Sequence, residues 1–309
     1  MMRSVAHSVL VRVPGKINLQ LSVGPNEDDG YHGIVTVFQS ISLYDDVTVT
    51  RAQEGAGISI DISGDHTHGV PLDDSNLSTR AAFLMCEKYD LPTDLHIDIK
   101  KSIPVAGGMA GGSADAAATI LALDVLFSLG LSREEMYEIA APIGSDVPFM
   151  LSGGTAVGRG RGDQVTAALS RGTYHWVLAL SSIGLSTPAV YGECDRLRAG
   201  MQVASPHVND YLLQALLAED LAALGKSLVN DLQPAACSLR PALRLILDVG
   251  DDYGALGSIV SGSGPTVAFL VSDEDHALDL AVALTSSGVV GSVTRVSGPV
   301  PGARVVEIH

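Results

Sequence analysis

The sequence is short of cysteine, and this narrows the kind of protein it encodes. Only 3 of the 309 residues are cysteines, at Cys86, Cys194 and Cys237, with no C-x-x-C pair among them. An odd and scattered set supports neither a disulfide framework nor a zinc knuckle. A chain of about 300 residues buries roughly three quarters of its unfolded surface, so it needs no such staple. We therefore expect a protein of the reducing cytoplasm.

Positive charge and long apolar runs are also scarce. Lysine and arginine together number 19 against 35 for aspartate and glutamate, which gives a formal net charge of −16. A chain of this charge is unsuited to a broad nucleic-acid or anionic-membrane surface. The N-terminus lacks a signal-peptide core, and no run reaches the ~18 apolar residues of a membrane span. We expect a soluble protein whose partner is a small molecule, with no nucleic acid and no membrane.

Several signature motifs of enzymes are missing. The sequence has no G-x-x-x-x-G-K-[ST], no G-x-G-x-x-G, no H-E-x-x-H and no G-x-S-x-G. These absences argue against P-loop nucleotidases, Rossmann enzymes, zinc peptidases and α/β-hydrolases. His66 and His68 form an H-x-H pair without a third ligand in sight, so we expect no metal site of the protein's own.

The composition itself is that of a globular protein, with 46% hydrophobic residues, 33 glycines and no internal repeat. Alternating or β-branched apolar positions predict strands at residues 8–23, 34–50, 57–62, 94–100 and 155–158. Apolar spacing and polar N-caps predict helices at residues 76–89 and 112–129. Because the strands and helices do not alternate regularly, the pattern favours the α+β class over a doubly wound parallel sheet.

The pattern resets near residue 167, which indicates a second domain. A strand over 175–180 is followed by helices within 187–250, a glycine-rich strand turn over 258–271, a helix from 274 and a last strand near 289–296. We therefore predict two domains, residues 1–166 and 167–309, with a cleft between them.

The strongest local signal is a glycine-rich run between a strand and an alanine-rich helix. Gly107, Gly108, Gly111 and Gly112 fall within six positions just before the helix. Glycines let backbone N–H groups converge on an anion, and a helix N-terminus adds partial positive charge, so the run would suit phosphate groups. The alternative is a tight, closely packed turn, in which Ser113 is an ordinary N-cap rather than a phosphate or metal contact.

Two charged residues stand in unusual surroundings. Lys16 follows a Pro-Gly bend in a predicted strand, where a lysine is usually only solvated. Asp146, in the run GSDVPF, is followed by apolar residues and a proline. It is either the cap of a short helix or a general base in a partly desolvated site, kept ionised by a nearby cation.

Three further clusters allow a functional and a structural interpretation. Tyr31 and His32 lie between two glycines, as an exposed turn or as an aromatic platform with a hydrogen-bonding neighbour. Arg159 and Arg161 alternate with glycines, suited to an anionic substrate or to surface carboxylates. SGSGPT at 261–266 is either a hairpin corner or a second backbone wall against phosphates.

The order of PGKIN, P-x-x-G-G-M-A-G-G-S-A and SGSGPT resembles the three signature motifs of the GHMP kinases, over most of the chain. This resemblance implies ATP-dependent small-molecule kinases with a two-domain α+β fold and the active site in the interdomain cleft. DGYH, GSDVPF and GGTAVGRGRG are similar to the branch whose substrate is a cytidine diphosphate-linked methylerythritol. The resemblance thus implies phosphorylation of its 2-hydroxyl, a step of non-mevalonate isoprenoid biosynthesis, with ATP as co-substrate and Mg²⁺ on the ATP phosphates.

The resemblance also implies roles for particular residues. Lys16 and Asp146 would be the catalytic pair. Substrate would be bound by Asn18, Tyr31, His32 and Tyr191, with the two tyrosines and the histidine around the cytosine. ATP would be bound by Pro104, Val105, Ala106, Gly107, Gly108, Met109, Ala110, Gly111, Gly112, Ser113 and Ala114, with Lys101 and Asn76 near the nucleotide.

The chain departs from the family's pattern at four positions. Ala106 and Ala110 replace common glycines, and Ala114 and Asp115 replace a common Ser-Asn pair. The extra methyl groups would narrow the range of loop conformations, and a carboxylate at Asp115 would need Mg²⁺ or an outward rotamer near phosphates.

Two alternatives remain open at this point. One is another GHMP kinase, such as a homoserine or mevalonate kinase, which the Tyr31-His32 pair disfavours. The other is a non-catalytic nucleotide-binding regulator on the same fold, which the presence of both Lys16 and Asp146 disfavours.

Overall fold

The computed structural model describes residues 6–27, 30–105, 107–181 and 183–309. Its strands are β1 (Ser8–Asn26), β2 (His32–Arg51), β3 (Ile58–Gly64), β4 (Leu95–Lys101), β5 (Thr155–Arg159), β6 (Gln164–Ala167), β7 (Tyr174–Leu180), β8 (Val229–Asn230), β9 (Gly257–Val260), β10 (Val267–Val271), β11 (Ser292–Gly298) and β12 (Arg304–Ile308). Its helices are α1 (Leu77–Tyr89), α2 (Gly111–Leu126), α3 (Arg133–Ala140), α4 (Val147–Ser152), α5 (Thr187–Leu197), α6 (Asp210–Ala218), α7 (Leu221–Ser227), α8 (Gln233–Leu239), α9 (Ala242–Asp252) and α10 (Glu274–Ser287). Within the described ranges, every helix is too short or too polar to cross a bilayer.

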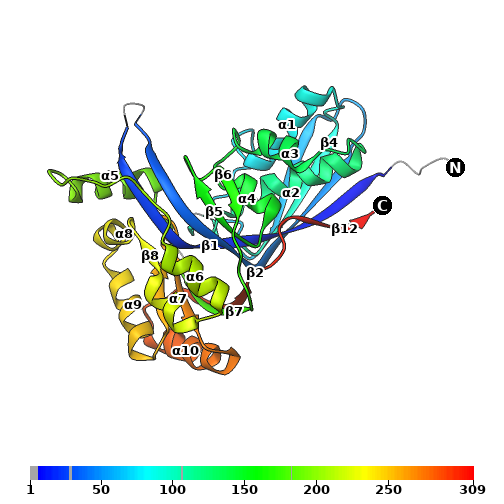
Figure 1. Ribbon diagram of the computed structural model, residues 1–309. Coiled ribbons are helices and arrows are strands. Elements are labelled where there is room, and N and C mark those ends of the chain that lie inside the picture. Colours follow the sequence, from blue (N-terminus) through cyan, green and yellow to red (C-terminus); the bar gives the residue numbers. More distant parts are fainter. Residues whose placement is uncertain (1–5, 28–29, 106, 182) are drawn as a thin grey trace.

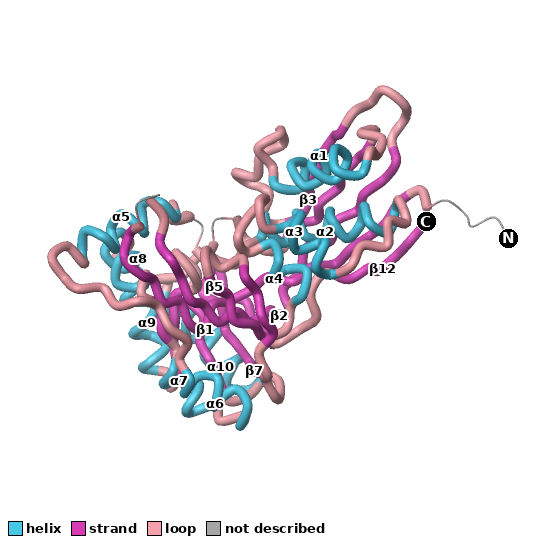
Figure 2. Tube along the Cα trace, turned by 45° about the horizontal axis from the view of Figure 1, so that its top comes forward, coloured by secondary structure: helices cyan, strands magenta, loops and turns pink. Residues whose placement is uncertain are grey.

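A long antiparallel hairpin of β1 and β2 runs through the whole molecule (Figure 1). In the larger sheet the strand order is β12-β1-β2-β4-β3, with β5 added beside β2 and β8 beside β1. The alternation of apolar residues along β1 places every second side chain on the buried face of this sheet. Val9, Val11 and Val13 are fully buried there. The helices α1, α2 and α3 cover the inner face of the sheet, as Figure 2 shows.

The smaller sheet has the order β11-β7-β10-β9 and packs against helices of the C-terminal half. The sequence of β7, YHWVLAL, is almost entirely apolar because both of its faces are buried. Trp176 and Leu178 belong to the core shared with the larger sheet, whereas Val177 and Ala179 belong to the core under α8 and α10. The α+β class predicted from the sequence is confirmed.

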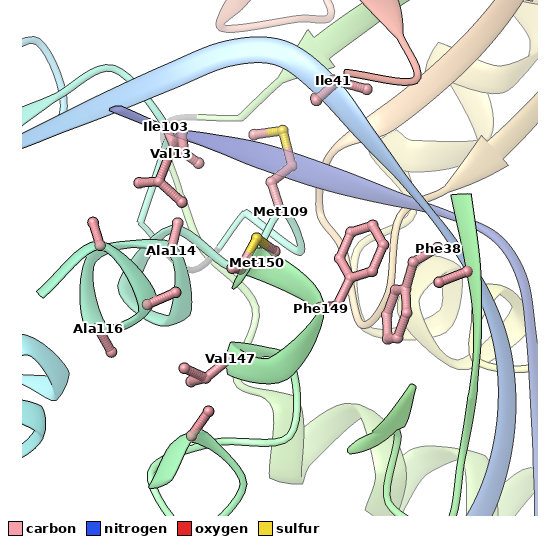
Figure 3. Packing of buried hydrophobic residues seen from close by; sticks show 14 of the residues in the cluster. Val13, Phe38, Ile41, Ile103, Met109, Ala114, Ala116, Val147, Phe149 and Met150 are labelled. Carbon is pink, nitrogen blue, oxygen red and sulfur yellow. The ribbon is translucent and has the colours of Figure 1, made fainter. Parts of the chain in front are cut away.

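The two halves are joined by packed and hydrogen-bonded contacts. The indole Nε1 of Trp176 donates to Oε1 of Gln39 on β2 at 2.9 Å. Nearby, the rings of Phe38 and Phe149 stack with centroids 4.8 Å apart, and Met109 and Met150 lie beside them (Figure 3). The bond from Trp176 to Gln39 joins the two halves, whereas the ring stacking lies within the N-terminal half, between β2 and α4.

The last part of the chain differs from the sequence prediction. The predicted last strand near 289–296 corresponds to β11, but the chain continues to β12, which pairs antiparallel with β1. Because β12 is a short edge strand whose residues are mostly exposed, it has no apolar alternation that stands out in the sequence. The boundary between residues 166 and 167 stays a prediction, and β12 returns to the first sheet from beyond it.

A buried ionic cluster joins β2, β4 and α2 beneath the glycine-rich loop. Nζ of Lys101, the last residue of β4, lies 2.5 Å from Oδ2 of Asp45 and 2.7 Å from Oδ2 of Asp115. Oδ1 of Asp45 also accepts backbone N–H bonds from Ser102 and Ile103. The cluster therefore fixes both ends of the loop that runs from β4 to α2.

One member of this cluster has a strongly raised pKa. Burial raises the pKa of Asp115 to about 8 from its ordinary value of 3.8, with the charge of Lys101 opposing the shift and that of Asp45 adding to it. Within the described residues Oδ1 of Asp115 has no hydrogen-bond partner. Between these two pKa values the folded chain holds a proton that the unfolded chain has lost. The free energy of unfolding should therefore fall as the pH rises through this window.

Replacing Asp115→Asn should flatten this pH dependence, because an amide keeps the shape of the side chain and does not ionise. We expect the melting temperature of the variant relative to wild type to increase steadily from about pH 5 to about pH 8. Thermal unfolding followed by circular dichroism at several pH values measures the difference. Asp98→Asn, at an exposed position on β4, is the matched control, and its melting temperature should change with pH as that of wild type does. If the difference in melting temperature between Asp115→Asn and wild type stayed constant over this pH range, the raised pKa of Asp115 would be contradicted.

Candidate active site

Two adjoining cavities form one cleft where the two halves of the molecule meet. The aromatic cavity, of about 730 Å³, is lined by Tyr31, His32, Asp195 and their neighbours. The loop cavity, of about 570 Å³, is lined by Lys16, Asp146 and the glycine-rich loop. The residues common to both are Ile34, Ser145, Arg161, Thr187, Pro188 and Tyr191.

Lys16 lies at the floor of the loop cavity, with only 4% of its surface exposed. Its Nζ donates to Oδ1 of Asn18 at 2.6 Å and to the carbonyl of Gly108 at 3.0 Å. Oδ2 of Asp146 is 3.7 Å away. Burial lowers the pKa of Lys16, and the negative charge of Asp146 partly opposes this shift.

Asp146 occupies the N-cap position of α4, but its side chain makes no capping hydrogen bond. The following residues Val147, Pro148 and Phe149 are buried and anchor the helix in the core. About a quarter of the carboxylate is exposed, with a side-chain exposure of 27%. The capping alternative raised by the sequence is therefore not realised by the side chain, which is left available to the cleft.

The glycine-rich loop presents the N-terminus of α2 to the same cavity. Gly111, Gly112 and Ser113 form its first turn and line the cavity, so the N-terminal end of a 16-residue helix, with its partial positive charge, lies at the cleft. Two loop residues, Gly108 at φ 77° and Ala110 at φ 59°, have left-handed backbone. At Ala110 this conformation is strained for an alanine, whereas a glycine would adopt it freely.

The SGSGPT segment forms the hairpin corner that the sequence allows, and its contact with phosphates stays a prediction. It is the hairpin corner between the antiparallel strands β9 and β10, and its Gly262 and Ser263 also line the loop cavity. Ser261 Oγ donates to the Gly108 carbonyl at 2.9 Å. A Cβ on Gly108 would lie 2.0 Å from the Ser261 carbonyl oxygen, so only glycine fits this contact.

The aromatic cavity is built from two turns and one helix. His32 and Tyr191 have ring centroids 5.1 Å apart at an interplanar angle of 41°. Nε2 of His32 lies 2.8 Å from Oδ1 of Asp195, which holds the imidazole in place. Tyr31 is 55% exposed, and the guanidinium of Arg161 lies 3.8 Å from its ring centroid.

The structure brings most of the predicted site residues together. Those that line the cleft are Lys16, Asn18, Tyr31, His32, Gly107, Gly108, Ala110, Gly111, Gly112, Ser113, Asp146 and Tyr191. The predicted residues that do not line it are Asn76, Lys101, Pro104, Val105, Met109 and Ala114. Ala106 lies outside the described residues.

Four of the residues away from the cleft have structural roles that explain their positions. Lys101 is enclosed by Asp45 and Asp115, and the Asn76 side chain caps α1 by accepting from Ser78 N–H. Met109 and Ala114 are fully buried in the core beneath the loop. Asp115 likewise points to Lys101 and away from the loop cavity, which is the rotamer that the sequence analysis allowed as an alternative to Mg²⁺.

Sequence reasoning missed Asp195 and gave no role to Thr187 or Pro188. A signal for Asp195 existed, because it follows Tyr191 by four residues on α5 and therefore shares its helical face. Its contact with His32, which is far away in the sequence, had no such signal.

Comparison with known proteins places these features in a family. The model of the GHMP kinases N terminal domain matches residues 76–154, and that of the GHMP kinases C terminal matches residues 212–290. A 4-diphosphocytidyl-2-C-methyl-D-erythritol kinase of Thermobifida fusca is 53% identical over 97% of this chain and 98% of its own length.

Solved structures agree with this placement. A crystal structure of a 4-(cytidine 5'-diphospho)-2C-methyl-D-erythritol kinase is 29% identical, covers 93% of this chain and 98% of its own, and superposes with a TM-score of 0.73. A homoserine kinase from Cytophaga hutchinsonii has a TM-score of 0.77 over 99% of both chains but only 17% identity, which shows a shared fold. The chain belongs to the GHMP kinases, and within them to the family of 4-diphosphocytidyl-2-C-methyl-D-erythritol kinases.

Proposed function

We propose that this chain transfers the γ-phosphate of ATP to the 2-hydroxyl of 4-diphosphocytidyl-2-C-methyl-D-erythritol, a step in non-mevalonate isoprenoid precursor synthesis. The observation that carries the proposal is the continuity of the cleft. A cavity lined by Tyr31, His32 and Tyr191 shares six of its lining residues with the cavity that holds the Lys16–Asp146 pair and the first turn of α2. The names of the relatives point to the same reaction.

The aromatic cavity suits cytosine, which offers a flat π face and a polar edge. Tyr31 and Tyr191 provide aromatic faces, and His32 provides a polar group whose orientation is set by Asp195. Homoserine and mevalonate have no ring to fill this volume. A homoserine or mevalonate kinase is therefore the less suitable assignment.

In the loop cavity, Asp146 would accept the proton of the attacking hydroxyl while Lys16 neutralises charge on the transferred phosphoryl group. The 3.7 Å separation leaves the carboxylate only loosely paired, so its oxygens remain accessible to a hydroxyl. Asn18 accepts from Lys16 and donates Nδ2–H to Thr36 Oγ1 at 2.8 Å, which fixes the direction of the lysine. Phosphoryl transfer depends mainly on such positioning.

The ATP phosphates would lie against Gly111, Gly112 and Ser113, where the helix dipole and free N–H groups attract anions. Among the described residues, no three of His, Cys, Asp or Glu are grouped to hold a metal by themselves. The Ser113 hydroxyl and the Asp146 carboxylate are oxygen donors in the cavity, which fits Mg²⁺ carried in by ATP. When bound, Mg²⁺ would neutralise charge on the phosphates.

A cytoplasmic location and the absence of nucleic-acid binding stay predictions. They are supported by three free cysteines and the net charge of −16.

The reaction is tested by measuring ADP release with the cytidyl substrate, homoserine and mevalonate. We expect turnover with the cytidyl substrate and none above background with the other two, because only the first fills the aromatic cavity. If a substrate without cytidine were phosphorylated equally well, the cytidyl specificity would be excluded and the chain would be a GHMP kinase of another specificity. ATP binding without ADP release for all three would indicate a regulator.

Asp146→Asn should reduce turnover by about 10²- to 10⁴-fold, because the amide preserves shape but does not accept the proton. ATP affinity, measured by calorimetric titration, should stay within a few-fold of wild type. More than about a tenth of wild-type turnover would exclude general-base catalysis by Asp146.

Gly112→Val should weaken ATP binding roughly tenfold, because the side chain would intrude on the helix N-terminus that faces the cleft. A Cβ at this position meets only Leu77, at 3.5 and 3.9 Å, so the melting temperature should change little. Titration with the cytidyl substrate is the internal control and should give an unchanged affinity. Equal losses for both ligands, together with lower stability, would show that Gly112 serves only the turn.

A further inference from the structure

Arg161 occupies the junction between the two cavities. It lies in the turn from β5 to β6, between Gly160 and Gly162, both of which have positive φ. Among the described residues that line both cavities, Arg161 is the one with a charged side chain. Its guanidinium is stacked over Tyr31, 3.8 Å from the ring centroid. A cation is therefore placed where the cytosine site opens toward the catalytic pair.

The chemistry of the proposed substrate favours a cation at this point. With its base in the aromatic cavity and its hydroxyl beside Asp146, the linking diphosphate must cross the junction. The aromatic cavity also carries the carboxylates of Asp163 and Asp195, in a chain of net charge −16, which would repel an uncompensated diphosphate. A guanidinium is planar and matches phosphate oxygens with two parallel N–H donors.

We propose that Arg161 binds the diphosphate of the substrate and thereby makes the enzyme select a cytidine diphosphate over cytidine alone. This inference rests on the proposed function and adds a specificity residue to it. The stacking on Tyr31 holds the guanidinium close to the base, and the flanking glycines allow the turn to adjust when the diphosphate arrives.

A purely structural role for Arg161 has a different consequence. If the guanidinium only braced the Tyr31 ring, its loss would weaken every ligand that stacks there, with or without phosphate. If it served the ATP phosphates, its loss would raise the KM for ATP. Binding of the acceptor diphosphate predicts a loss confined to ligands that carry that group.

The test compares the inhibition constants of CDP and cytidine, each competing with the cytidyl substrate at saturating ATP. In wild type we expect CDP to bind more tightly than cytidine. In Arg161→Gln the CDP constant should rise about 10- to 100-fold, while that of cytidine changes by less than about threefold. In Arg161→Lys the CDP inhibition constant should lie between those of wild type and Arg161→Gln, because lysine keeps the positive charge but lacks the two parallel N–H donors of a guanidinium. Arg159→Gln, at the exposed last residue of β5, which lines neither cavity, should give the wild-type inhibition constants for both ligands.

Three results would overturn the inference. Equal losses of CDP and cytidine affinity in Arg161→Gln would assign Arg161 to bracing Tyr31. An increased KM for ATP with unchanged CDP inhibition would assign it to ATP. Failure of CDP to inhibit the wild-type enzyme at all would remove the cytidine diphosphate site and with it the proposed function, an outcome distinct from the other two.

Discussion

The carbonyl oxygen of Gly108 accepts hydrogen bonds from Lys16 on β1 and from Ser261 at the β9–β10 corner. Three segments that are distant in the sequence therefore meet at one atom. The contact requires a residue without Cβ, because a methyl group would overlap the Ser261 carbonyl. Since the same loop leads into α2, this constraint places the catalytic lysine, the helix N-terminus and the C-terminal half in a single geometry. The cleft lies between these three parts, and the hydrogen bonds to Gly108 fix their relative positions.

Lys101 and Lys16 are both buried, but their different neighbours shift their pKa values in opposite directions. For Lys101, burial lowers the pKa but the charges of Asp115 and Asp45 outweigh it, so the pKa is raised overall. For Lys16, burial prevails over a single, more distant carboxylate, so the pKa is lowered. The charge of Lys101 is fully compensated inside the protein. That of Lys16 is not, which leaves it able to interact with a phosphoryl group.

The sequence predicts those features that have a local signature. Alternation marks β1 and β2, glycine spacing marks the loop before α2, and Lys16 with Asp146 stand out by their neighbours. What it does not predict depends on contacts between distant residues. Nothing near Lys101 in the sequence indicates that Asp45 and Asp115 enclose it, and a place near the nucleotide is implied only by the resemblance to the GHMP kinases. The contact between His32 and Asp195 was likewise invisible, because it joins β2 to α5.

The pairing of β12 with β1 has a consequence for synthesis of the chain. Val9 pairs with Ile308, so one edge of the first strand is completed by a segment that is translated much later. Until then β1 presents unpaired N–H and C=O groups along that edge, which is a template for pairing with other chains. Contacts of such long sequence separation also form slowly. The nascent N-terminal half would thus depend on protection of this edge, for example by a chaperone, until β12 has left the ribosome.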